Sequence, residues 1–166
     1  MFFVNVTYKE KFKISGHVGF ISSTYMEKDI VAITVNYRLG ALGFLDFTEY
    51  LGEEYRQSGN NGILDIVQAL VWVKENIEAF GGDPDNVTLF GQSAGAKQIM
   101  CLTLMEKAKG LFHKVFAESG GVHSIRDVVT ARKITDIFMK DAGLTKENAH
   151  ELLTMPWEKI VQAQAG

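Results

Sequence analysis

The sequence predicts an α/β fold in which a mostly parallel β-sheet is flanked by helices. The prediction rests on short apolar runs rich in β-branched residues, longer segments with helical spacing between them, and a short turn at each junction. Alternation of strand and helix is typical of parallel sheets, because parallel neighbours need a long crossover connection. The expected strands cover residues 29–36, 86–90 and 115–117, and the expected helices between them cover residues 62–79 and 96–107.

The first strong strand signal is the run from Asp29 to Asn36. Six of its eight residues are apolar or β-branched, and neither Gly nor Pro interrupts it, which predicts a strand buried on both faces. Residues 2–8 alternate loosely between apolar and polar and are a further candidate strand. Residues 39–62 are rich in glycine and other turn formers, so they are expected to form a loop.

Helical spacing begins at residue 62. A broad apolar stripe runs along residues 62–79, and the segment Phe80-Gly81-Gly82-Asp83-Pro84 ends it, with Gly just past the helix and Pro shortly after. The stripe consists of Ile63, Ile66, Val67, Leu70, Val71, Val73 and Ile77.

The chain beyond residue 124 is expected to be helical. The helical segments cover about residues 125–141, 145–154 and 156–164, and Asp141-Ala142-Gly143 and Met155-Pro156 separate them. The whole pattern therefore predicts an α/β sheet region followed by a helical C-terminal stretch.

The composition excludes several classes of function. The chain has 166 residues, 46% of them hydrophobic, and a net charge of -3, so it lacks the basic surplus of a nucleic-acid-binding protein. No apolar run reaches the roughly 18 residues of a membrane-spanning helix. The absence of a recognisable signal peptide and the single cysteine, Cys101, favour a cytoplasmic location. Nothing in the sequence implies a metal or an organic cofactor.

The sharpest motif is the pentapeptide Gly91-Gln92-Ser93-Ala94-Gly95. A strand leads into this GxSxG motif and a helix leads out, which is the context of a nucleophile elbow. Small residues at Gly91 and Gly95 allow the strand and the helix to approach closely. The alternative is a tight strand-to-helix connection without catalytic meaning.

The chemistry expected of an elbow follows from its position. Ser93 would present its hydroxyl at the carboxyl end of the sheet. The backbone N–H of Ala94 would point toward a developing oxyanion, and the helix N-terminus would add partial positive charge. These residue types in this order predict acyl transfer by a serine nucleophile.

A series of motifs occurs in order along the chain: Asn36-Tyr37-Arg38-Leu39-Gly40-Ala41-Leu42-Gly43-Phe44, Asn61-Gly62-Ile63-Leu64-Asp65, residues 69–77, residues 80–84, Asn86-Val87-Thr88, residues 91–95 and Glu118-Ser119-Gly120-Gly121. With these motifs, residues 29–121 closely resemble the type-B carboxylesterase and cholinesterase-like family of α/β-hydrolases, and residues 122–164 resemble the helical stretch that follows in that family. The resemblance implies a single, incomplete α/β-hydrolase domain over residues 1–166 and hydrolysis of small carboxylic esters through an acyl-serine at Ser93.

The resemblance also implies roles outside the elbow. It suggests a structural ion pair between Arg38 and Asp83, which is physically sensible because a charge in a buried glycine-rich loop needs a partner. The family's second oxyanion donor comes from a His-Gly-Gly-Gly-Phe-like loop, and the corresponding stretch here is Gly16-His17-Val18-Gly19-Phe20. Only Gly19 and Phe20 match that loop, so Gly19 is the candidate donor.

The chain departs from the family in its length. In this fold the acid and the histidine follow the serine, and in the family they lie further along than the 73 residues that follow Ser93 here. Of the three later histidines, His113 precedes a strand and His150 is expected on a solvated helix face. His123 follows the third strand at its carboxyl end and is the best local candidate for a base.

The family has a strand between the segments at 29–36 and 86–90. Residues 2–8 or 12–14 are the candidates for this position, and without either the sheet would have a gap with unpaired strand edges. Three readings follow: a truncated esterase with little or no activity alone, an esterase completed by a second chain or by His123, and a non-catalytic binding module. Self-association through exposed apolar surface is a further expectation.

Overall fold

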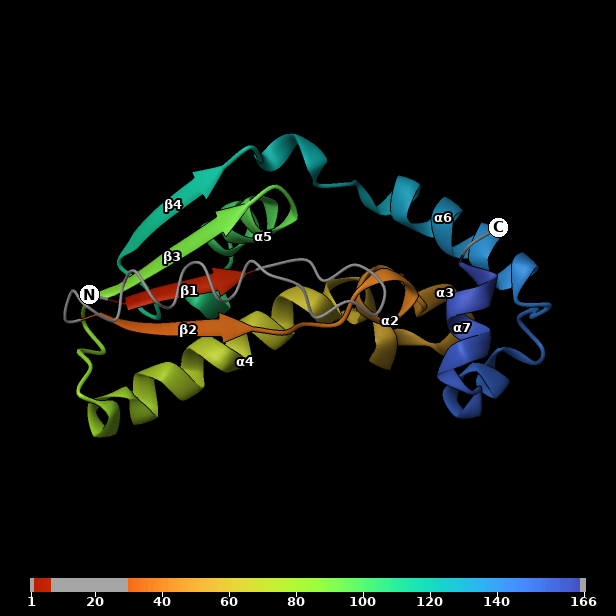
Figure 1. Ribbon diagram of the computed structural model, residues 1–166. Coiled ribbons are helices and arrows are strands. Elements are labelled where there is room, and N and C mark those ends of the chain that lie inside the picture. The colour runs from red at the N-terminus through yellow and green to blue at the C-terminus, as the bar shows by residue number, and fades with distance from the viewer. Residues whose placement is uncertain (1, 7–29, 165–166) are drawn as a thin grey trace. The chain divides into compact units, whose positions relative to one another are not determined.

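The computed structural model describes residues 2–6 and 30–164 (Figure 1). The chain divides into two compact units. The first unit combines Met1–Asn36 with Asp65–Ile125, and the second combines Tyr37–Leu64 with Arg126–Gly166. Each unit therefore joins segments that are far apart in the sequence. The single domain over residues 1–166 stays a prediction.

The first unit contains a four-stranded sheet in the order β2-β1-β3-β4. All neighbouring strands are parallel, and their arrowheads point the same way in Figure 1. Phe3 of β1 lies between Ala32 of β2 and Thr88 of β3. The strands are β1 (Phe2–Val6), β2 (Val31–Val35), β3 (Val87–Gln92) and β4 (Lys114–Glu118).

Strand β1 fills the position between β2 and β3, so the sheet has no central gap. The candidate strand at residues 2–8 is thereby confirmed over Phe2–Val6, and the alternative at residues 12–14 lies outside the described residues. The strand predicted at residues 29–36 is confirmed as β2, the end strand of the described sheet. The prediction that this strand is buried on both faces is wrong, because most of its residues are only half-buried. Only Val35 of β2 is buried, and Thr34 is exposed. Composition alone does not distinguish an edge strand from a central one.

Helix α4 (Asn61–Asn76) carries the predicted apolar stripe. Ile66 and Leu70 have no exposed surface, so this stripe contributes to the core at helical spacing. The 3-10 helix η3 (Ile77–Phe80) follows, and Gly81 ends it at a φ of 79°. A left-handed residue after a helix is the conformation that glycine adopts most readily.

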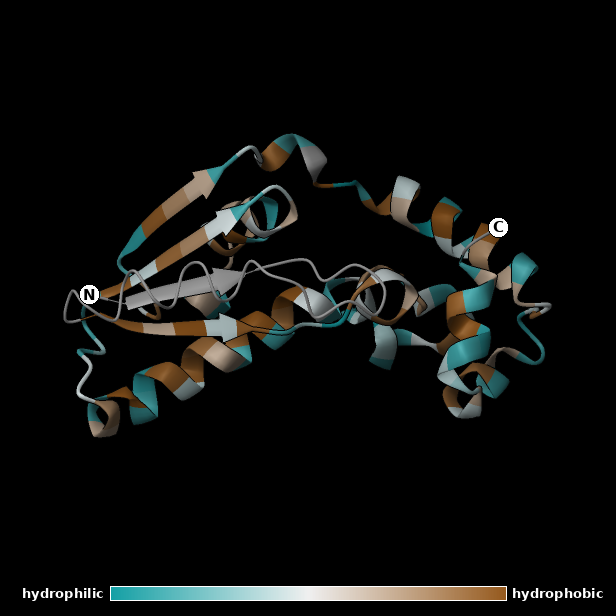
Figure 2. Cartoon of the chain, in the orientation of Figure 1, coloured by the Kyte–Doolittle hydropathy of each residue, from teal (hydrophilic) through white to brown (hydrophobic). Residues whose placement is uncertain are grey.

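After β3 come α5 (Ala94–Leu102), the 3-10 helix η4 (Glu106–Ala108), β4, and the 3-10 helix η5 (Val122–Ser124). Helix α5 packs against β1, β3 and β4. Figure 2 shows a hydrophobic middle and hydrophilic ends in β4, yet all five residues of this strand are exposed.

The second unit is helical. The prediction that residues 39–62 form a loop is therefore wrong. That segment folds into short helices. Its sequence has no helical periodicity that would predict them, because contacts with other residues of the unit stabilise these helices. One such contact is the buried hydrogen bond from Phe47 N–H to Ser58 Oγ, 2.8 Å long. The helices are α2 (Gly40–Phe44), α3 (Thr48–Leu51), η1 (Glu53–Tyr55), η2 (Ser58–Asn60), α6 (Val128–Asp141), η6 (Ala149–Thr154) and α7 (Trp157–Ala163).

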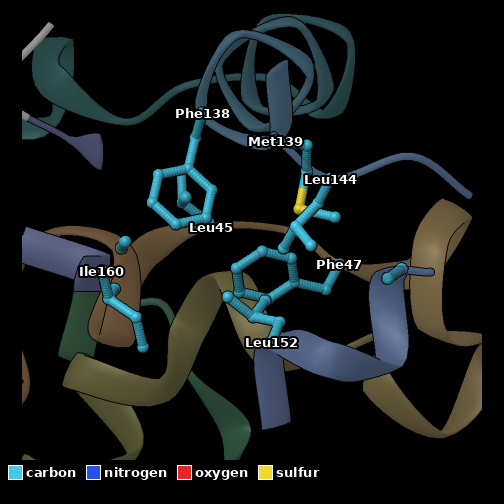
Figure 3. Packing of buried hydrophobic residues seen from close by; sticks show 9 residues of the cluster. Leu45, Phe47, Phe138, Met139, Leu144, Leu152 and Ile160 are labelled. Carbon is cyan, nitrogen blue, oxygen red and sulfur yellow. The ribbon is translucent and has the colours of Figure 1, made fainter. Parts of the chain in front are cut away.

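A separate apolar cluster forms the core of the second unit (Figure 3). Phe47 and Phe138 meet edge to face with ring centroids 6.1 Å apart, a favourable geometry for aromatic pairs. Figure 3 shows Met139 beside Leu144 above the ring of Phe47. Leu45 follows α2, Leu152 lies on η6 and Ile160 lies on α7, so the cluster connects residues 37–64 to residues 126–164.

Asp127 caps α6 at its N-terminus. Its carboxylate accepts a hydrogen bond from Thr130 N–H at 2.7 Å, and this bond holds the pKa of Asp127 below its ordinary value of 3.8. A lowered carboxyl pKa gives stability that is present above pH 3.8 and is lost as the pH falls through the lower folded-state pKa. The stability advantage of wild type over Asp127→Asn should therefore shrink on acidification.

Urea denaturation of both proteins between about pH 2.5 and pH 6 measures this difference, a range that brackets the ordinary Asp pKa. Asparagine keeps the side-chain oxygen that caps the helix, and the other carboxyl groups titrate in both proteins. A constant difference across the series would contradict the assigned role of the Asp127 charge.

Candidate active site

Ser93 lies between the end of β3 at Gln92 and the start of α5 at Ala94. Its φ is 52° and its ψ is -112°, a backbone conformation that costs an L-residue on the order of 1–3 kcal/mol. Strain of this kind is characteristic of a nucleophile elbow. The residue is exposed.

Gly91 and Gly95 lie where the strand and the helix meet. Both residues are buried. A Cβ atom on Gly91 would lie 2.6 Å from the carbonyl carbon of Gly95 and 2.8 Å from Cδ1 of Ile99. No side chain fits there without moving the first turn of α5. The close approach of β3 and α5 thus depends on glycine at position 91.

The end of β4 supports the same turn from the other side. Ser93 N–H donates a hydrogen bond to the Glu118 carbonyl at 2.8 Å, and this bond continues the ladder in which Gln92 is opposite Glu118. Ser119 also has a positive φ, of 55°. A Cβ atom on Gly120 would lie 2.5 Å from the Ser93 carbonyl oxygen. The sequence alone did not predict that residues 118–121 contact Ser93. The signal that could have shown it is the pair of glycines directly after a strand, which indicates a close approach of another segment.

Ala94 is the first residue of α5. Its N–H has no acceptor within the helix, because the first turn of any α-helix leaves its donors free. The first intrahelical bond runs from Lys97 N–H to the Ser93 carbonyl, at 3.1 Å. The free donors and the helix dipole favour negative charge beside Ser93.

The histidines of the described residues are separated by the fold. His113 lies at the amino end of the sheet, where its Nδ1 accepts a hydrogen bond from Val87 N–H at 3.1 Å. His150 is exposed on η6 in the second unit. His123 is exposed on η5, which follows β4 and packs against α5. Of these, His123 follows the carboxyl end of the sheet, as Ser93 does.

Arg38, Asp83, Gly19 and His17 are the other residues that the sequence singled out. Arg38 belongs to the second unit, and Asp83 belongs to the first. The carboxylate of Asp83 accepts a hydrogen bond from Asp85 N–H at 2.9 Å. The Arg38–Asp83 ion pair stays a prediction. Gly19 and His17 lie outside the described residues. Burial raises the pKa of the Cys101 thiol on α5, which disfavours a reactive thiolate.

Within residues 2–6 and 30–164 there is no group of three or more His, Cys, Asp or Glu side chains that could hold a metal ion. The helices of the same ranges include none with the length and apolar character needed to cross a membrane.

A parallel sheet with a strand–serine–helix turn at the carboxyl end of β3 defines a partial α/β-hydrolase fold. The solved carboxylesterase EST55 of Geobacillus stearothermophilus superimposes with a TM-score of 0.88 and 38% identity over 98% of this chain. The model of the carboxylesterase family matches residues 7–165. The chain belongs to the carboxylesterase family, which confirms the resemblance predicted from its motifs.

Curated relatives agree with this assignment. The chain is 42% identical over 135 residues to the para-nitrobenzyl esterase of Bacillus subtilis, and 50% identical over 93 residues to carboxylesterase 5A of Felis catus. The matches cover 81% and 56% of this chain. They cover only 27% and 16% of those relatives, and 36% of the Geobacillus enzyme. The chain therefore spans about a third or less of the length of these relatives.

Proposed function

We propose that the chain supplies the nucleophile of a carboxylic ester hydrolase and that Ser93 is the attacking residue. The observation that carries this proposal is the strained, exposed backbone of Ser93 between β3 and α5. Membership of the carboxylesterase family supports an ester as the substrate class. Both Gly91 and Gly95 belong to the turn that presents the serine.

In the proposed reaction, Ser93 Oγ forms a bond to the ester carbonyl carbon while its proton passes to a general base. The carbonyl oxygen takes up the electron pair and accepts a hydrogen bond from Ala94 N–H, with Gly19 N–H as the proposed second donor. Each such donor contributes about 3–4 kcal/mol. Collapse of the intermediate re-forms the carbonyl and breaks the ester C–O bond, and the base returns its proton to the departing oxygen, which leaves as the alcohol. Water then attacks the acyl-serine by the same steps, so that the acid leaves and Ser93 regains its proton.

We expect the chain by itself to have little hydrolytic activity. A serine hydroxyl without an adjacent general base is a poor nucleophile near neutral pH. Of the described histidines in the first unit, His113 is held at the amino end of the sheet and His123 is exposed. Slow covalent capture of Ser93 by a reactive phosphonate is the appropriate test of the nucleophile.

Intact-mass analysis after treatment with a fluorophosphonate tests the role of Ser93. The expected result is a single adduct on the wild-type chain and none on Ser93→Ala, with Ser119→Ala as the matched control because Ser119 also has a positive φ. Peptide mapping locates the adduct. A folded wild-type chain that remains unmodified, or an adduct that persists in Ser93→Ala, would contradict the proposal.

The exposure of β4 favours a second candidate, an esterase completed by another polypeptide. β4 is the end strand of the described sheet, and Val115 and Phe116 are 42% and 53% exposed. A second chain that adds a strand here and supplies an acid and a histidine would complete the reaction. A stable complex of fixed stoichiometry whose ester hydrolysis requires Ser93 would support it, and hydrolysis by the purified chain alone would contradict it.

A further inference from the structure

We infer that Gly120 is a positioning residue that fixes the direction of the Ala94 N–H, the oxyanion donor of the proposed reaction. The inference rests on the proposed function, and it assigns a task to the turn after β4. A Cβ atom on Gly120 would meet the carbonyl oxygen of the Ser93–Ala94 peptide unit, whereas a Cβ atom on Gly91 would meet Gly95. It acts through the backbone, because it has no side chain and no reacting atom.

The contacts place Gly120 against the carbonyl of Ser93. A Cβ atom built on Gly120 would lie 2.5 Å from Ser93 O, 2.8 Å from Ala96 Cβ and 3.1 Å from Lys97 N. Two of these three atoms belong to backbone, which cannot rotate away as a flexible side chain can. The neighbouring Ser93 N–H is fixed by its 2.8 Å hydrogen bond to the Glu118 carbonyl. Residues 118–120 therefore lie against both the N–H and the carbonyl group of Ser93.

The carbonyl of Ser93 and the N–H of Ala94 belong to one peptide unit. This unit is planar and trans, so its C=O and N–H bonds point in opposite directions and turn together. Any group that displaces Ser93 O must also turn the Ala94 N–H. Oxyanion donors work only when they are aimed at the position where negative charge develops. A methyl group at position 120 would therefore misdirect the donor, although Gly120 contacts no substrate.

The adjacent glycine provides a matched control. Gly121 has an extended backbone, with φ of -157° and ψ of -179°, so alanine can adopt its conformation. The nearest atom to a Cβ on Gly121 is Nδ1 of the His123 side chain, at 3.3 Å. Gly120→Ala and Gly121→Ala thus add the same methyl group at successive positions, and only the first meets Ser93.

The test compares both variants with wild type in fluorophosphonate labelling over a range of probe concentrations. For Gly120→Ala we expect the maximal inactivation rate to fall about 10-fold or more, since loss of a whole oxyanion donor costs about 100-fold to 1000-fold. The half-saturating probe concentration should stay within about two-fold, because ground-state binding does not use the oxyanion donor. Gly121→Ala should lower the maximal rate much less, because its methyl group would meet the rotatable side chain of His123 rather than the Ser93 carbonyl. Equal maximal rates for the two variants would overturn the inference.

If Gly120→Ala folds poorly, the double variant with Ala96→Gly removes the contact with Ala96 Cβ but keeps the one with Ser93 O, so the rate should stay low. If folded wild type is not labelled at all, the proposed nucleophile fails, and the amide resonances decide the inference. Gly120→Ala must then shift the Ser93 and Ala94 resonances more than Gly121→Ala does, and equal shifts would overturn it.

Discussion

Gly91→Ala should destabilise the chain by about 2–3 kcal/mol, toward the upper end of the range for overpacked interiors. The added methyl group would lie 2.6 Å from the carbonyl carbon and 2.8 Å from the carbonyl oxygen of Gly95. These backbone atoms belong to the first turn of α5, which cannot retreat without disturbing Ser93. Fluorophosphonate labelling of Ser93 should fall in the same variant. Urea denaturation followed by circular dichroism measures the loss of stability.

Gly59→Ala is the control for Gly91→Ala. The nearest atom to a Cβ on Gly59 is 3.6 Å away, on Asp46, which is an ordinary van der Waals distance. Both variants add one methyl group and remove one glycine from the unfolded chain, so the effects on the unfolded state are equal. Equal unfolding free energies for the two variants would show that β3 and α5 do not meet as closely as the structure places them.

The sequence predicted those parts of the fold that depend on periodic spacing or on residues close together in the chain. Spacing and neighbouring small residues predicted three features. They are the apolar stripe of α4, the strands that end at Gln92 and Glu118, and the turn at Ser93. The turn at Gly91-Gln92-Ser93-Ala94-Gly95 could be located because its strand and helix are its immediate neighbours. Residues close together in the sequence therefore sufficed to predict most of the candidate site.

The features that the sequence did not predict depend on contacts between distant segments. The short helices of residues 40–60 pack into a core with α6, and nothing in their own spacing specifies that core. The edge position of β2 depends on where β1 pairs. The closeness of Gly120 to Ser93 likewise requires β4 to lie beside β3, because α5, η4 and β4 separate the two residues along the chain.

Phe138→Ala should remove about 3–5 kcal/mol of stability, the usual cost of truncating a buried phenylalanine. Phe138 is 4% exposed and meets Phe47 edge to face, so its loss leaves a cavity where α6 joins the segment at residues 37–64. The reporter is the fluorescence of Trp157 on α7, in a Trp72→Phe background that leaves Trp157 as the single tryptophan.

Ile137→Ala separates loss of core packing from loss of helix surface. Ile137 precedes Phe138 on α6 but is 60% exposed, so its truncation should change the unfolding free energy by less than about 0.5 kcal/mol, as for other surface sites. The contrast matters because α6 and the segment at residues 37–64 are far apart in sequence, and a cluster of side chains rather than a sheet ladder holds them together. Similar transitions for Phe138→Ala and Ile137→Ala would show that this cluster does not hold the second unit together.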